Sequence, residues 1–289
     1  MKSIKYFLFP VYLACFVPLT AQNIISGKVF LDKNGNGIQD RSEHGIKAVP
    51  VSNGRDVVLT DKDGNFSISV ADGESLFPIF PSGYTSSSGD IIRSSDFLFK
   101  TRQSKDKVNF ALKKEKQPEH FTLGAIGDIQ MGNPQELDYA NQTIIPELAG
   151  RKDIQLAVWL GDLVNNRLEL FEDVREMIRC TEIPSWVLPG NHDRITNGHT
   201  LQDSLFNCYF GASAYAFNYG NVHFIILNNV APDSKRGYKA RISDRQMTFI
   251  KNDLSYVPKD RFVVFCQHIP LVHTENIEDL KTLLSGRNK

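Results

Sequence analysis

Three short polar motifs carry side chains that could bind metal ions. They are Gly-Asp-Ile-Gln at 127–130, Gly-Asp-Leu-Val-Asn-Asn at 161–166 and Gly-Asn-His-Asp at 190–193. Each comes directly after a short apolar run that is typical of a buried strand. Because a rigid sheet presents such strand ends together, we expect these carboxylates and amides to converge. Strand-ending turns of an ordinary α/β domain are the alternative interpretation, since Gly-Asp pairs are common in turns.

A fourth motif, Gln-His-Ile-Pro at 267–270, adds an imidazole after the apolar run 262–266. Carboxylate, amide and imidazole donors suit a pair of divalent cations that share one carboxylate. Such a pair, about 3.5–4 Å apart, supplies a hydroxide nucleophile at neutral pH and neutralises the charge of phosphoryl oxygens. The four motifs therefore favour hydrolysis of a phosphate ester.

Together the four motifs resemble those of the calcineurin-like metallophosphoesterases, in which a bridging aspartate, here Asp162, touches both metals. The resemblance implies that Asp128 and Gln130 bind one ion. Asn191 and His268 would bind the other ion. Gln130 stands where most members carry histidine, and its neutral oxygen favours Mn²⁺ or Mg²⁺, with Fe and Zn²⁺ as alternatives. This departure resembles the branch of the family that cleaves nucleotide diphosphate compounds with manganese.

The residues around these ligands are candidates for catalysis and substrate binding. The resemblance places His192 at the edge of the site, where its imidazole can protonate the leaving group, with Asp193 holding its orientation. Substrate contacts are predicted for polar side chains on the neighbouring loops, namely Asn165, Asn166, Arg194 and His199. For Arg194, pairing with a carboxylate is an alternative.

The chain stops at Lys289 without one motif of the resembled family. Members carry a Gly-His-x-His string after the His-x-Pro strand, and its histidines complete the two coordination spheres. We interpret the sequence as truncated before that strand, so that the phosphoesterase domain is partial. A natural, degenerate enzyme is the alternative. In both cases each metal would lack one imidazole, and edge strands would be left unpaired.

Residues 1–21 are predicted to be a secretory signal peptide. Lys2 and Lys5 precede an apolar stretch that leads to the small residue Ala21. This stretch contains two prolines and falls short of the roughly 20 residues that a spanning helix needs. We therefore expect a secreted, periplasmic or cell-surface protein without a transmembrane segment after cleavage. A lipoprotein anchored at Cys15 is less favoured.

Charge and cysteine content limit the partners and cross-links. The chain has 33 basic and 33 acidic residues, and this balance gives no support to nucleic-acid binding. Cys180 and Cys266 are expected to be buried free thiols, whereas a disulfide between Cys180 and Cys208 is left open. The expected partner is a small phosphorylated substrate, and the sequence predicts no oligomeric state.

The pattern of apolar runs divides the chain into two domains. Residues 22–112 show strand patterns separated by turns, which predicts a β-sandwich of transthyretin-like or immunoglobulin-like type. Residues 113–119 are charged and polar and are predicted to be a solvated linker. Residues 120–289 alternate apolar strands with amphipathic helices, one of them between Asn133 as N-cap and Gly150 as C-cap. This α/β (α+β) pattern, with the resemblance, implies a four-layer αββα phosphoesterase domain that is C-terminally incomplete.

One loop of the predicted sandwich matches a twelve-residue calcium loop. It has side-chain oxygens at positions 1, 3, 5, 9 and 12, a carbonyl at position 7 and Gly37 at position 6. The predicted calcium ligands are Asp32, Asn34, Asn36, Ile38, Asp40 and Glu43. The domain resembles the calcium-binding repeats of surface adhesins as well. A solvated Asn-Gly hairpin turn is the alternative.

The expected function is hydrolysis of a phosphomonoester, a phosphodiester or a nucleotide diphosphate by a metal-bound hydroxide at a dinuclear centre. On resemblance, Gln130 favours nucleotide-like or diphosphate substrates. The alternative is a calcium-stabilised adhesion or glycan-binding module whose phosphoesterase domain is degenerate and inactive.

Overall fold

The computed structural model describes residues 23–197 and 200–287. The predicted signal peptide, at 1–21, lies outside these ranges. Every helix within them is too short or too polar to cross a membrane.

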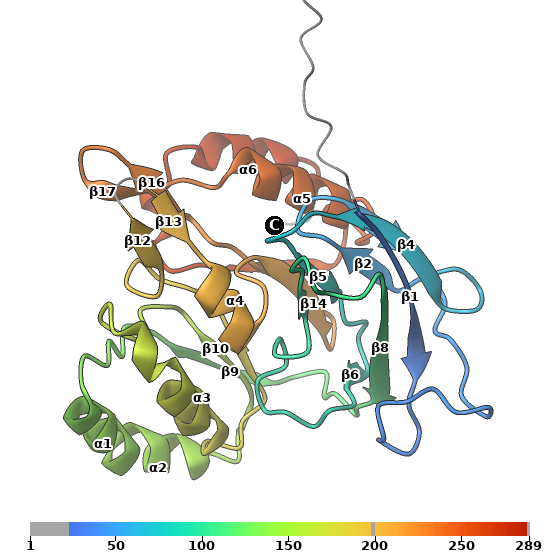
Figure 1. The fold of residues 1–289 in the computed structure, drawn as a ribbon, viewed down its shortest axis with the longest axis horizontal. Helices are drawn as coiled ribbons and strands as arrows, with labels where there is room; N and C mark the ends of the chain where they lie inside the picture. The colour runs from blue at the N-terminus through green and yellow to red at the C-terminus, as the bar shows by residue number, and fades with distance from the viewer. Residues whose placement is uncertain (1–22, 198–199, 288–289) are drawn as a thin grey trace, which may run out of the picture.

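The N-terminal part of the molecule is built from strands, as predicted. They are β1 (Asn23–Leu31), β2 (Pro50–Ser52), β3 (Val57–Leu59), β4 (Asn65–Val70), β5 (Ser75–Pro78), β6 (Tyr84–Ser86), β7 (Leu98–Phe99) and β8 (Lys107–Lys114). One sheet has the order β4-β1-β8-β6 and the other the order β3-β2-β5-β7. In β4, buried Phe66, Ile68 and Val70 alternate with polar residues, which is the pattern of a strand with one face in a core. These strands lie on the right in Figure 1.

The segment predicted to be a linker, 113–119, is held by hydrogen bonds. β8 runs two residues into it and pairs with β6 up to Lys114. The side-chain oxygen of Gln117 accepts hydrogen bonds from the N–H groups of Gly83 (2.8 Å) and Gly220 (2.9 Å). Because Gly83 and Gly220 belong to different parts of the molecule, Gln117 fastens the two parts together.

Two three-stranded sheets form the centre of the second part. Their strands are β9 (Thr122–Ile126), β10 (Ile154–Trp159) and β11 (Ser185–Val187) in one sheet, and β14 (Tyr215–Tyr219), β15 (Val222–Ile226) and β18 (Phe262–Cys266) in the other. The orders are β11-β10-β9, all parallel, and β14-β15-β18, in which β15 and β18 are parallel. The sheets face each other, and the rings of Trp186 and Phe217 stack between them with centroids 3.9 Å apart.

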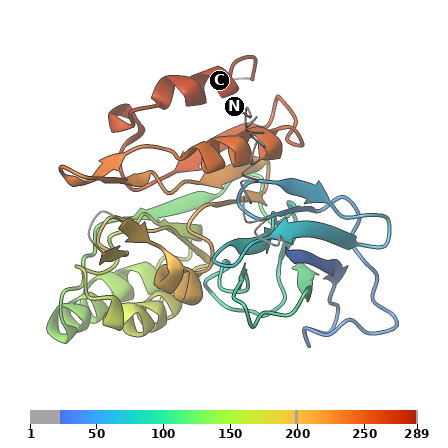
Figure 2. The same ribbon diagram turned by 45° about the horizontal axis from the view of Figure 1, so that its top comes forward.

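Helices cover the outer faces of both sheets. They are α1 (Pro134–Gln142), α2 (Ile144–Ala149), α3 (Phe171–Arg179), α4 (Ser204–Phe210), α5 (Asp244–Leu254) and α6 (Ile277–Leu283), with the 3₁₀ turns η1 (Leu168–Leu170) and η2 (Leu271–His273). The second part also contains two hairpins. After β11 comes the pair β12 (Ile195–Asn197) and β13 (Thr200–Gln202), and after β15 comes the pair β16 (Val230–Asp233) and β17 (Gly237–Ala240). Figure 2 shows α5 and α6 above the sheets and α1 to α3 below them. The predicted αββα layering is confirmed.

The helix predicted between Asn133 and Gly150 is broken in the middle. The side chain of Asn133 caps α1, as predicted, by accepting a backbone N–H at 3.0 Å. α1 ends at Gln142, and a separate helix, α2, runs from Ile144 to Ala149 with Gly150 as its C-cap. Pro146 explains the break, because proline has no N–H and its ring excludes the carbonyl four residues earlier.

The edges of the two central sheets differ. The β11 edge is covered, because Ser185 exchanges backbone hydrogen bonds with Ile91 and Arg93 from the N-terminal part. Phe80 and Phe97 pack against Trp186 at the same boundary. In the described part of the chain, β9 and β18 each keep one edge without a partner strand.

The three described cysteines are free thiols. Cys266 is buried, and burial raises the pKa of its thiol to about 12. Cys180 and Cys208 are exposed and do not form a disulfide. The burial prediction is wrong for Cys180, because this residue follows the last turn of α3 at the surface.

Candidate metal centre

The predicted ligands lie in loops at the carboxyl ends of four strands. Asp128 follows β9, Asp162 follows β10, Asn191 follows β11 and His268 follows β18. Donor atoms of Asp128, Asp162 and His268 all lie within 4.8 Å of one another. This spacing fits ligands of a metal ion, because two donors at roughly 2.0–2.5 Å from one ion are at most about 5 Å apart.

The loops after β9 and β10 continue to pair beyond the sheet. The N–H of Gln130 donates to the carbonyl of Asp162 (2.8 Å), and the N–H of Met131 donates to the carbonyl of Leu163 (3.0 Å). Asp128, Gln130 and Asp162 have φ values of 55°, 42° and 49°. Residues other than glycine rarely adopt this left-handed conformation. Such strain is concentrated at functional sites, where surrounding contacts enforce the direction of a side chain.

Two glycines allow the loops after β10 and β11 to touch. A Cβ atom on Gly190 would lie 2.0 Å from Oδ1 of Asp162, and one on Gly161 would lie 2.4 Å from the nitrogen of Gly190. Gly161 also has a φ of 85°. The glycine before each of these polar residues is therefore required by close backbone approach.

Asp162 is the centre of the cluster. Only 2% of its surface is exposed. Its Oδ1 accepts the backbone N–H of His192 (2.9 Å), and its Oδ2 accepts a side-chain N–H of Gln130 (3.0 Å). Oδ2 also lies 3.5 Å from Nε2 of His268. This central position is the one that a bridging carboxylate would occupy.

The orientation of His268 fits a metal ligand. Its Nδ1 lies 2.9 Å from the carbonyl oxygen of Leu160, and only a protonated Nδ1 can donate to that oxygen. In the neutral ring, Nε2 then carries a lone pair. Nε2 faces Oδ1 of Asn191 at 3.2 Å, so two acceptors point at each other. A metal ion between the two atoms, a proton on Nε2, or a half-turn that brings the Asn191 N–H to the same place would each satisfy this contact. A second hydrogen bond that fixes the tautomer is typical of metal-binding histidines.

Asn229, which the motif analysis missed, holds the loop of His268 in place. It is fully buried, its side-chain N–H donates to the carbonyl of Ile269 (2.6 Å), and its oxygen accepts the N–H of Ile269 (3.2 Å). Asn229 follows β15, the strand that pairs in parallel with β18. A polar residue at the end of a buried strand was the signal that could have identified it.

Gln130 presents its amide to Asp162. In the described conformation, its Nε2 donates to Oδ2 of Asp162. A half-turn about the last bond of the side chain exchanges Nε2 and Oε1. The amide oxygen would then point at the same place as the carboxylate, an arrangement that requires a cation.

His192 lies at the edge of the centre, but Asp193 does not contact its ring as predicted. Nε2 of His192 lies 3.9 Å from Oδ2 of Asp162, and its side chain is 30% exposed. Its Nδ1 is buried and has no hydrogen-bond partner among the described residues. The carboxylate of Asp193 accepts the backbone N–H groups of Gly190 (2.8 Å) and Val164 (3.0 Å). The orienting role predicted for Asp193 is wrong, because its carboxylate ties two loops together instead.

The environment of Asp193 opposes ionisation. Burial raises the pKa of this carboxyl to about 6, although hydrogen bonds from the backbone of Gly190, Val164 and Leu163 act in the opposite direction. The neighbouring charge of Asp162 adds to the increase. Asp193 is thus a structural group between the loops.

The four residues predicted to contact substrate have different positions. Asn165 and Asn166 are exposed beside the centre, and Asn166 has a φ of 57°. Arg194 is 8% exposed, and its guanidinium donates to Asp203 and to the carbonyl of Val230. The prediction of a substrate contact is wrong for Arg194, because the pairing alternative holds. His199 lies outside the described residues.

The predicted calcium loop satisfies its own acceptors. Asp32, 2% exposed, accepts the N–H groups of Gly35 (2.7 Å) and Gly37 (2.8 Å). Asn34 and Asn36 donate their amides to Asp40, and the Oδ1 of Asn36 accepts the N–H of Ile38. Glu43 accepts the N–H groups of Lys33 (2.7 Å) and Asp40 (3.0 Å). Calcium binding by this loop stays a prediction.

A four-layer αββα fold with carboxylate, amide and imidazole donors at its strand ends defines the metallophosphoesterase class. The chain belongs to the calcineurin-like phosphoesterase family, whose model matches residues 121–286, more than half of the chain. A second model, described as the N terminal of calcineurin-like phosphoesterase, matches residues 33–115. The resemblance stated from the motifs is confirmed.

A curated relative belongs to the same superfamily. The chain is 26% identical over 122 residues to a 3′,5′-cyclic-nucleotide phosphodiesterase from Nostoc sp.. The match covers 42% of this chain and 43% of the relative. Together with the family, this similarity supports phosphoester hydrolysis in general.

Proposed function

We propose that this protein is a metal-dependent phosphoesterase whose preferred substrate is a phosphodiester. Metal dependence rests on one observation above all. Donor atoms of Asp128, Asp162 and His268 all lie within 4.8 Å of one another, and Nε2 of His268 lies 3.2 Å from the amide of Asn191. Strained loops hold the other donors, Asp128 and Gln130, in the same place.

The predicted ligands would divide around Asp162. As the family resemblance implies, Asp128 and Gln130 would hold one ion and Asn191 with His268 the other. Two divalent ions held there (Mn²⁺, Mg²⁺, Fe or Zn²⁺) would supply a nucleophile from water and neutralise the charge on the phosphoryl oxygens. The chain's own contribution is orientation, because Leu160, Gln130 and backbone N–H groups fix the donors before substrate arrives.

His192 is the candidate proton donor. Its ring lies at the rim of the centre, 3.9 Å from Asp162, with a side chain that is partly open to solvent. A proton on Nε2 can pass to the leaving oxygen of an ester positioned beside Asp162. Nδ1 of His192 has no hydrogen-bond partner among the described residues, so the ring lacks the predicted contact with Asp193.

The charge around the centre supports a diester. A phosphodiester carries one negative charge, whereas a monoester carries about two at neutral pH, since its second pKa is about 6. Arg167 and Arg194 directly follow the motifs at 161–166 and 190–193, and they are already paired with Glu169 and Asp203. The name of the Nostoc relative, a cyclic-nucleotide phosphodiesterase, agrees with this choice.

The test is an assay of bis(p-nitrophenyl) phosphate, p-nitrophenyl phosphate and 3′,5′-cyclic AMP, before and after chelation and with Mn²⁺ restored. We expect diester hydrolysis that chelation removes and Mn²⁺ restores. His192→Ala should lower turnover about 100-fold and leave the bound metal, measured by elemental analysis, unchanged. His44→Ala, an exposed histidine in the N-terminal part, is the control. Turnover that survives chelation would refute metal dependence.

We propose in addition that the protein is exported. The support is the composition of residues 1–21, which combines basic residues, an apolar stretch and a small residue at the end. Cell fractionation and N-terminal sequencing test it. A cytosolic protein that keeps Lys2 and Lys5 would contradict the proposal.

A further inference from the structure

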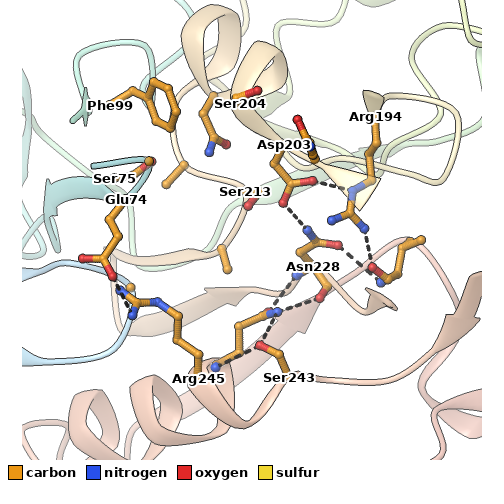
Figure 3. Close-up of a pocket in the computed structure, with 18 of the residues that line it drawn as sticks. Glu74, Ser75, Phe99, Arg194, Asp203, Ser204, Ser213, Asn228, Ser243 and Arg245 are labelled. Carbon is orange, nitrogen blue, oxygen red and sulfur yellow. Dashed lines mark hydrogen bonds and ion pairs between the residues drawn. The ribbon is translucent and has the colours of Figure 1, made fainter. Parts of the chain in front are cut away.

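A cavity lies between the N-terminal strands and the phosphoesterase domain. Its volume is about 510 Å³, which is within the range of roughly 300–1,000 Å³ that is typical of small-molecule sites. β5 and β7 line one side, and the start of α4, the loop before β14 and the start of α5 line the other (Figure 3). None of the five predicted ligands of the metal centre lines it. The cavity is therefore separate from the metal centre.

One wall of this cavity carries a buried amide without a partner. Asn207, in α4, is 9% exposed, and its Oδ1 is buried without a hydrogen-bond partner among the described residues. Folding gains nothing from such a group, because a buried polar atom without a partner costs free energy. An amide held in this way is suited to a ligand that both donates and accepts hydrogen bonds.

The charges around the cavity are balanced. Arg194 pairs with Asp203, and Arg245 pairs with Glu74 at 2.8 Å across the boundary of the two parts. Arg241 pairs with Asp244 at 3.3 Å. Figure 3 shows the first two of these pairs on opposite sides of the cavity. Because each arginine already has a carboxylate partner, the lining favours a neutral ligand over a phosphate.

The remaining lining suits a sugar ring. Ser75, Ser204 and Ser213 are half-buried, so their hydroxyls can donate to and accept from a ligand. Phe99, which is half-buried, adds aromatic surface on the N-terminal side. Hydroxyl and amide groups around an aromatic wall match the two faces of a saccharide, which has hydroxyls at its rim and C–H groups on its flat side. We propose that this cavity binds one or two units of a neutral saccharide.

Binding of sugars by the whole chain tests the proposal. The probes are glucose, galactose, mannose, N-acetylglucosamine and their disaccharides, measured by saturation-transfer NMR and calorimetry. We expect at least one to bind with a dissociation constant on the order of 1 mM, as befits a ligand of about a dozen heavy atoms. Inorganic phosphate is the counter-probe and should not compete. Absence of binding by every probe, or displacement of the sugar by phosphate, would overturn the proposal.

Substitution of Asn207 locates the binding. Asn207→Leu keeps the size of the side chain, removes the amide and should weaken sugar binding at least tenfold. Its melting temperature should be equal or higher, because the amide oxygen has no hydrogen-bond partner among the described residues. Asn141→Leu, at an exposed position of α1, is the matched control and should bind as the parent does. If Asn207→Leu fails to fold, Ser75→Ala and Ser213→Ala replace it. Unchanged affinity in these variants would refute the assignment.

Discussion

The metal centre and the loop at 32–43 use the same kinds of side chain but hold them in different ways. In the metal centre, carboxylates, amides and an imidazole come from four strand ends that are far apart in the sequence. In the loop, all donors lie within twelve residues. The acceptors of the loop are filled by its own N–H groups, whereas Nε2 of His268 and Oδ1 of Asn191 face each other.

This difference sets what a cation must displace. At the centre, donor atoms from separate strand ends already lie close together, and the strained loops are already in position. A calcium ion in the loop must replace internal hydrogen bonds, such as those from Lys33 and Asp40 to Glu43. We therefore expect strong binding at the centre and, at best, the weak affinity of about 10⁻⁴–10⁻³ M that is found in extracellular calcium modules.

The largest effect is expected from the same substitution made in both regions. Asp162→Asn removes the shared carboxylate charge, so turnover should fall by at least about 100-fold and bound metal should be lost. Asp40→Asn, the matched change in the loop, should leave turnover as it is. Elemental analysis and diester kinetics on both variants check this. Retention of two metal ions per chain in Asp162→Asn would break the comparison.

Substitution of a glycine in each region should separate close packing from backbone conformation. Gly190→Ala places a Cβ 2.0 Å from Asp162, and overpacking of this kind should cost about 2 kcal/mol of unfolding free energy or more. Gly37 has a φ of 73° and open space around it. Gly37→Ala should therefore cost only about 1 kcal/mol, through backbone strain alone. Chemical denaturation measures both, and equal losses would contradict the distinction.

The contact between the two parts of the molecule should depend on pH. Burial raises the pKa of Asp90, but the hydrogen bonds from Arg179, Ile92 and Ser95 outweigh it, so the pKa lies below the usual 3.8. The ionised Asp90 accepts from Arg179 at 2.5 and 3.1 Å. Because the folded state holds the proton less tightly than the unfolded chain, this stabilisation is complete above pH 3.8 and is lost as the pH falls through the folded pKa.

Asp90→Asn tests this link. At pH 7 the free energy of unfolding of the variant should be about 1.5 kcal/mol lower than that of the parent, because a hydrogen-bonded charge is removed. The difference in unfolding free energy between variant and parent should disappear as the pH falls below 3.8, the usual pKa of the carboxyl. Denaturation curves between pH 2.5 and pH 7 measure it. A gap that stays constant over this range would mean that the charge of Asp90 does not stabilise the contact.

The smallest effect is expected from calcium. At a concentration twice the dissociation constant, binding to the folded loop should add about 0.6 kcal/mol to stability. The increase in melting temperature should disappear in Asp40→Asn and persist in Asp162→Asn. If Asp162→Asn alone removes the increase, the calcium acts at the metal centre and the predicted loop is an ordinary turn.

The order of the elements could be predicted from the sequence because it follows from local patterns. Alternation of buried and polar residues indicates β4, and apolar runs indicate β10 and β18. The break of the helix at Thr143 was missed, although Pro146 lies well inside the predicted helix, where a proline interrupts the backbone hydrogen bonds.

Partners across the fold could not be predicted in the same way. Arg194 and Asp193 stand beside Asn191, yet one pairs with Asp203 and the other ties backbone loops together. Asn229 supports His268 although 38 intervening residues separate them along the chain. Such choices depend on which groups meet after the sheets pack, since a buried polar atom bonds to whatever donor lies nearest.

The sequence by itself determined which donors follow each strand, because motif position and strand pattern are properties of consecutive residues. Only the tertiary structure decided that Nδ1 of His268 donates to Leu160, that Gly190 touches Asp162 and that Oδ1 of Asn207 has no hydrogen-bond partner among the described residues. These facts depend on distances between segments that are remote along the chain. Packing of the two sheets sets those distances, and no local pattern encodes them.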